Sequence, residues 1–169
     1  MELNFSKDEF LDLLHFNVCS SYAFNTRQLE LYKEVLDWTQ ISSNQVISWN
    51  YDIIKQFESY LDWDFLKKNK KVNEVITLGL LFPHRVELPK CHCSFQYDFC
   101  ECDNSKWHSG DWERGFVKGD NFSPRGHSEA DWVIQKIVNS MDKAMLADVL
   151  LRGYVDNNLL IQNNIHLTE

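Results

Sequence analysis

The sequence predicts a mainly α-helical protein of the α+β type, with a zinc-stapled β-hairpin in its centre. Three observations support this class. Apolar residues recur at helical spacing, a pattern repeats after 25 residues in the first half, and four of the five cysteines lie between positions 91 and 102. We divide the chain into a repeat-like helical region (1–75), an extended segment with hairpin and loop (76–127), and C-terminal helices with a tail (128–169). With 169 residues, these parts fit one compact domain.

A first helix is predicted to begin after Ser6. The run Ser6-Lys7-Asp8-Glu9 has the form of a capping box, in which the serine and the glutamate each bond a backbone N–H group at the helix start. Phe10 and Leu14 lie on the apolar face, and the helix is expected to end near Cys19.

Two further helices are predicted in the repeat-like region. One runs from Asn25, as its cap, to about Trp38, and the other covers Asn50 to Tyr60. The residues expected to point inward in the first of these are Leu29, Tyr32, Val35 and Leu36.

A triplet repeats within this region: Leu36-Asp37-Trp38 recurs as Leu61-Asp62-Trp63. Further pairs keep the same spacing, namely Ile41 with Leu66, Asn44 with Asn69, and Ile47 with Val72. A fixed period of this size is typical of stacked helical units. Over about residues 29–75 the pattern resembles the short tryptophan-asparagine repeats of certain uncharacterised viral and bacterial proteins, and the resemblance implies an architecture but no chemistry.

The repeated residues also have a physical interpretation of their own. Trp and the aliphatic residues are expected to pack successive helices, while Asn44 and Asn69 tolerate the left-handed conformation that ends a helix. The second copy differs from the first by carrying Glu74 where the first has Trp49.

The segment from Val75 to Phe82 is rich in β-branched and apolar residues and stops at Pro83. It predicts a strand or a buried extended segment, with a short helix as the alternative.

Two helices and a short strand are predicted after residue 127. Ser128 starts the first helix, and the second closes at Gly153. A short strand is predicted at Leu159 to Ile161. The apolar side of the first helix is expected to consist of Trp132, Ile134, Ile137 and Val138.

The cysteines follow the pattern C-x-C, six residues, C-x-C. Two close pairs on the arms of a hairpin can supply the four ligands of a structural zinc ion. Disulfides and free thiols are the alternatives, and His84, His92 or His108 could replace one ligand. Four thiolates leave no open coordination position, so the metal would stabilise the fold rather than act on a substrate. The predicted ligands are Cys91, Cys93, Cys100 and Cys102, and Cys19 is left as an unpaired, buried thiol.

A second group of histidines and carboxylates follows in a glycine-containing loop. His108, Asp111 and His127 are residue types that a metal-dependent nuclease or hydrolase uses. Their order matches no recognised motif, and a solvated loop is the alternative. No P-loop, dinucleotide-binding, nucleophile-elbow or H-E-x-x-H motif is present.

The charge distribution bears on partners. The formal net charge is −8, and residues 1–64 hold 4 Lys/Arg against 11 Asp/Glu, which argues against general nucleic-acid binding. One basic island could contact a phosphate or an acidic partner, and it comprises Lys67, Lys68, Lys70 and Lys71.

Together these patterns favour a non-enzymatic, acidic, zinc-stapled binding protein of bacterial or phage origin. An inhibitor or immunity-type protein, acting through an acidic or aromatic surface, has this profile. The alternatives are the metal-dependent nuclease or hydrolase and a nucleic-acid-binding zinc module. The first 16 residues have no secretory signal, and no apolar run approaches the ~18 to 20 residues that span a membrane. We therefore expect a cytoplasmic protein.

Overall fold

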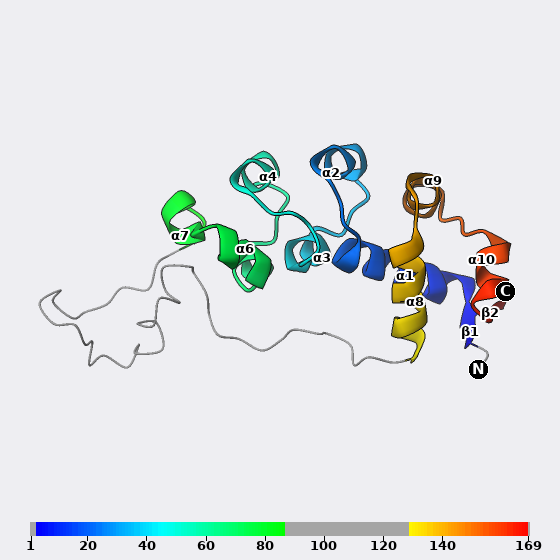
Figure 1. Ribbon diagram of the computed structural model, residues 1–169. Coiled ribbons are helices and arrows are strands. Elements are labelled where there is room, and N and C mark those ends of the chain that lie inside the picture. Colours follow the sequence, from blue (N-terminus) through cyan, green and yellow to red (C-terminus); the bar gives the residue numbers. More distant parts are fainter. Residues whose placement is uncertain (1–2, 87–128, 169) are drawn as a thin grey trace, which may run out of the picture. The chain divides into compact units, whose positions relative to one another are not determined.

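The computed structural model describes residues 3–86 and 129–168, and these are mostly helical with one two-stranded parallel sheet (Figure 1). The chain divides into two compact units, one of residues 1–47 with 123–169 and one of residues 48–122. The elements of the first unit are β1 (Leu3–Ser6), α1 (Lys7–Ser21), α2 (Thr26–Tyr32), α3 (Trp38–Ser43), α8 (Glu129–Ser140), α9 (Lys143–Ala147), the π-helical turn η2 (Asp148–Arg152), α10 (Asn157–Gln162) and β2 (Ile165–Thr168). Those of the second are α4 (Tyr51–Gln56), α5 (Trp63–Leu66), α6 (Lys70–Val75) and α7 (Leu78–Leu81).

The parallel strands join the two ends of the first unit. β1 pairs with β2 in the register Leu3 to Ile165 through Ser6 to Thr168. The predicted capping box at the start of α1 is confirmed. Ser6 Oγ accepts a hydrogen bond from the backbone N–H of Glu9, and the Glu9 carboxylate accepts one from the backbone N–H of Ser6.

The core of the first unit lies around α1, which contacts α3 and α8 (Figure 1). Phe10 and Leu14 are fully buried on α1, and Ile134 and Ile137 are buried on α8. Burying one side chain of this size contributes about 1.5–3 kcal/mol, so this packing is a main source of the unit's stability.

The single helix predicted from Asn25 to Trp38 is wrong. Asn25 caps a helix as expected, but α2 ends at Tyr32, and α3 starts at Trp38. The physical reason is Asp37, whose carboxylate accepts hydrogen bonds from two backbone N–H groups and so begins a new helix. Val35, expected to point inward, lies in the intervening turn and is 38% exposed.

The two repeat asparagines do not adopt the predicted left-handed conformation. Their φ angles are −65° for Asn44 and −74° for Asn69. Asn44 is fully buried, and its side chain donates to the carbonyls of Cys19 (2.9 Å) and Tyr22 (3.0 Å). Its Oδ1 accepts from the backbone N–H groups of residues 46 and 47. The asparagine therefore joins its own segment to the end of α1 through its side chain.

The strand predicted over Val75 to Phe82 is also wrong. Residues 78–81 form the helical turn α7, so the short-helix alternative holds. The buried residues Leu78, Phe82 and Val86 are four apart, whereas Leu80 is 65% exposed. A spacing of four is that of successive helical turns, and a strand would need a spacing of two.

Several local hydrogen bonds recur at positions 25 residues apart. The carbonyls of Tyr32, Phe57 and Phe82 each accept from the backbone N–H groups three and four residues later. The indole Nε1–H of Trp38 donates to the Lys33 carbonyl, and that of Trp63 to the Glu58 carbonyl. Equivalent sequence positions therefore form equivalent turns in this part of the chain.

The C-terminal helices match the prediction in part. Helix α8 is present, but Trp132 is 70% exposed and does not join the apolar side. Gly153 ends η2 with φ = +56°, a left-handed conformation that glycine adopts without strain.

The short strand predicted at Leu159 to Ile161 is wrong. These residues belong to α10, because Asp156 caps that helix, and the strand follows at Ile165–Thr168. Within the described ranges, no helix is long and apolar enough to cross a membrane.

We predict that Asn44→Ala lowers the free energy of unfolding by about 3 kcal/mol, since it leaves buried carbonyl and N–H groups without partners. Urea denaturation followed by circular dichroism measures the change. The exposed neighbour provides the control, with Gln45→Ala staying within about 0.5 kcal/mol of the wild type. A loss for Asn44→Ala as small as that of the control would contradict the role of the asparagine as an anchor.

Candidate functional site

The residues predicted for zinc and for catalysis lie outside the described part of the chain. This applies to Cys91, Cys93, Cys100 and Cys102 and to His108, Asp111 and His127. Both sites therefore stay predictions. Among residues 3–86 and 129–168, no group of three or more His, Cys, Asp or Glu side chains is placed to hold a metal ion.

Cys19 lies on α1 and is a buried, free thiol, as expected. Burial raises its pKa to about 12. Because the thiolate is the reactive form, this residue is chemically inert at neutral pH.

The basic island is partly neutralised by its own neighbours. Lys67 pairs with Asp64 at 2.7 Å, and Lys71 pairs with Glu74 at 2.8 Å. The ammonium of Lys68 lies 5.8 Å from the centre of the Phe65 ring. Hydrogen bonding from Lys67 also lowers the pKa of Asp64. The local positive field is therefore smaller than the four lysines in sequence suggest.

The acidic N-terminal segment is likewise partly engaged within the fold. Asp37 and Asp62 cap helices, Glu9 completes the capping box of α1, and Glu30 pairs with Lys33. Carboxylates held in this way are oriented by the backbone, so the segment is not a uniform acidic face.

Glu58, in the turn after α4, is bound by several side chains of the described chain. Its carboxylate is bound by the cationic side chains of Lys55 at 2.8 Å and Arg85 at 3.1 Å and by the His84 imidazole at 2.5 Å. The Glu58 side chain is only 15% exposed, whereas those of His84 and Arg85 are 55% and 41% exposed. Glu58 thus holds together three nitrogen-bearing side chains that face solvent, two of them cations.

Hydrogen bonds determine the electrostatics of this group. Those from Lys55, His84 and Arg85 lower the pKa of Glu58 to about 2. The hydrogen bond between Lys55 and Glu58 raises the pKa of Lys55. Glu58 is therefore ionised throughout the physiological range, and it acts as a counter-ion rather than as an acid or base.

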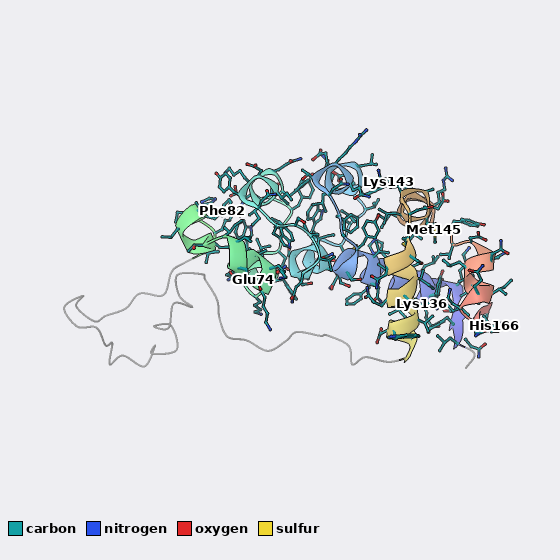
Figure 2. All side chains as sticks on the ribbon, viewed as in Figure 1. Glu74, Phe82, Lys136, Lys143, Met145 and His166 are labelled. Atoms are coloured by element: carbon teal, nitrogen blue, oxygen red, sulfur yellow. The ribbon has the colours of Figure 1, made fainter. Side chains whose placement is uncertain are left out.

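Aromatic rings lie beside part of this group. The Arg85 guanidinium lies 5.8 Å from the centre of the Trp63 ring, a cation–π contact. Phe82, fully buried, lies between Trp63 at 5.3 Å and a stacked Tyr51 ring at 5.6 Å (Figure 2 labels Phe82). Tyr51 is 45% exposed. We call the set Tyr51, Lys55, Glu58, Trp63, Phe82, His84 and Arg85 the Glu58 cluster.

The main chain also fixes Glu58, because its carbonyl accepts the Trp63 indole N–H at 3.1 Å. The glutamate is therefore bound at both its carbonyl and its carboxylate. Chemically, the Glu58 cluster offers two cations and an imidazole against one carboxylate, next to exposed aromatic surface. This arrangement suits the binding of another surface, and it contains no nucleophile paired with a base.

Sequence reasoning identified His84 only as an alternative zinc ligand, and it missed Glu58 and Arg85. The available signal was the 25-residue period, which extends to Phe82 and Val86 and places residues 84 and 85 one period beyond the turn at Glu58.

Comparison of the chain with models of known families, with curated proteins and with solved structures found no match.

We predict that Glu58→Gln lowers the thermal unfolding midpoint at pH 7, because it removes the counter-ion of Lys55 and Arg85 and the carboxylate that His84 contacts. The folded-state pKa lies below the ordinary value of 4.5, so the carboxylate stabilises the fold above about pH 4.5. That contribution is lost as the pH falls towards 2. The difference in midpoint between wild type and variant should therefore shrink between pH 5 and pH 2, as scanning calorimetry can measure.

The matched control is Glu74→Gln, which breaks the exposed pair with Lys71. An exposed pair contributes little, so this variant should stay close to the wild type at every pH. Equal effects of the two variants would show that Glu58 has no special role.

Proposed function

We propose that this protein is a non-enzymatic binding protein that covers a surface of a partner protein, as an inhibitor or immunity-type protein does. The observation that carries the proposal is the Glu58 cluster. Tyrosine, tryptophan and arginine are the residues most enriched among those that dominate binding energy at protein interfaces. Here Tyr51, Trp63 and Arg85 lie together within one unit of the chain.

The fixed geometry of these side chains supports the proposal. Arg85 is bound by Glu58 and stacked near Trp63, and Tyr51 stacks on buried Phe82. Ordering a mobile side chain on binding costs about 0.5–1.5 kcal/mol, so side chains held before binding lose less. Such a surface is suited to tight association.

Charge indicates the kind of partner surface. Lys55, His84 and Arg85 share a single carboxylate, which leaves donor capacity on their exposed nitrogens. A partner surface that offers carboxylate or carbonyl oxygens next to an apolar side chain would complement the Glu58 cluster. Leu80 and Leu81 of the same unit, 65% and 48% exposed, add apolar area to such an interface.

The proposal includes two structural parts. We propose that residues 29–75 are a short helical repeat array that resembles the tryptophan-asparagine repeats. The hydrogen bonds that recur at positions 25 residues apart support this proposal. We also propose that Cys91, Cys93, Cys100 and Cys102 hold one structural zinc ion, which their spacing supports.

The partner can be tested directly. The full chain is used to capture its partner from the source cell, and affinity is then measured by calorimetry with both proteins purified. We expect Tyr51→Ala and Arg85→Ala each to weaken binding at least about tenfold, the loss typical of central interface residues.

The control is Tyr154→Ala, which removes a somewhat more exposed tyrosine from the other unit and should change affinity less than about twofold. Circular dichroism checks that each variant is folded. If both cluster variants bind as the wild type does, or if no partner is retained, the proposal is wrong.

The zinc site predicts about one zinc ion per purified chain, measured by elemental analysis. Cys100→Ser should lower this content and the unfolding midpoint together, because metal binding contributes to folding. Cys19→Ser, at the buried thiol outside the predicted ligand set, should keep its zinc. If the purified wild-type protein contained no zinc, and adding zinc left its unfolding midpoint unchanged, the site would be excluded.

A further inference from the structure

A surface pocket of 280 Å³ lies where three parts of the first unit meet. Its walls come from the start of β1, one face of α8 and the turn between α10 and β2. The lining residues are Leu3, Trp132, Val133, Lys136, Gln162, Asn163 and Asn164. The pocket is separate from the Glu58 cluster, which belongs to the other unit.

The charge of the lining is unusual for this chain. The protein carries a net charge of −8, yet the pocket is lined by one lysine, three carboxamides and no acidic side chain. Lys136 forms no ion pair with any residue in the described ranges. An ammonium group without a carboxylate beside it is available to an external anion.

Trp132 gives the pocket an apolar wall. It lies four residues before Lys136, so the two share one face of α8. The ring is 70% exposed, while Ile134, Ile137 and Val138 of the same helix are buried. The opposite side of α8 therefore packs against the core, and the Trp132 indole can contact a ligand in the pocket.

The third wall is held rigidly by the backbone. Asn164 has φ = +54°, its N–H donates to Ile161, and its carbonyl accepts from Leu3 at 2.9 Å. The side chain of Asn163 donates to the Leu159 carbonyl. Within the described ranges, the side-chain amides of Gln162 and Asn164 have no partner, so their N–H groups can donate to a ligand.

We propose that this pocket binds the carboxylate of a compact aromatic acid. The Lys136 ammonium and the amide N–H groups are donors for the carboxylate, and the Trp132 ring is a platform for a flat apolar group. The volume is just below the about 300 Å³ at which pockets begin to enclose drug-sized ligands, so the ligand is small. The same chemistry occurs in a free aromatic acid and in the C-terminal residue of a peptide that ends in phenylalanine.

The test uses phenylacetate as the probe and phenylacetamide as its uncharged counterpart. Nitrogen–proton NMR spectra of the full chain follow the indole signal of Trp132, assigned by its loss in Trp132→Leu. We expect phenylacetate to shift this signal to saturation and phenylacetamide to bind at least about tenfold more weakly, as the loss of a charge-assisted hydrogen bond predicts.

Two lysine variants locate the charge (Figure 2 labels both residues). Lys136→Gln should weaken phenylacetate at least about tenfold and leave phenylacetamide unchanged. Lys143 is an exposed lysine of α9 outside the pocket lining, so Lys143→Gln should change the affinity for neither phenylacetate nor phenylacetamide. Equal binding of acid and amide, no shift of the Trp132 signal, or no effect of Lys136→Gln would overturn the proposal.

N-acetylphenylalanine distinguishes the two sources of the carboxylate. Binding at least as tight as that of phenylacetate assigns the pocket to a peptide C-terminus, and weaker binding assigns it to a free acid.

Discussion

The backbone N–H groups at the start of a short helix must find hydrogen-bond partners, and in most short helices of the described chain a polar side chain bonds one or two of them. Helices α2 to α7 have between four and seven residues. The first four N–H groups of a helix have no partner within it, so helices this short depend on their caps and on buried contacts. Five of the six have such a cap, from Asn25, Asp37, Asn50, Asp62 and Asn69.

The same constraint connects local structure to the Glu58 cluster. The turn after α4 leaves the Glu58 carbonyl outside a helix, and the Trp63 indole at the start of α5 satisfies it. This bond holds residue 58 in place while its carboxylate receives His84 and Arg85. A polar requirement of the backbone thus helps to orient the charged and aromatic side chains that we propose contact a partner.

The helix starts that the sequence predicted at Ser6 and Asn25 are present, but those capped by Asp37, Asp62 and Asn69 were missed. The capping box at Ser6 and the cap at Asn25 are local patterns, and both are present. The end of α2 was missed because Asp37 restarts the helix within an apolar run that continues at helical spacing. The exposure of Trp132 was missed because its position relative to the core depends on how α8 packs against α1.

By itself, the sequence determined the helical class and the capped starts at Ser6 and Asn25, because capping side chains bond backbone groups only two or three residues away. Only the tertiary structure decided the contacts of Glu58 with His84 and Arg85, which lie 26 and 27 positions further along the chain. It also decided the pairing of β1 with β2 from opposite ends of the described chain. The physical reason is that such contacts form where buried apolar faces bring elements together. Those faces indicate that an element is buried, but not which element lies against it.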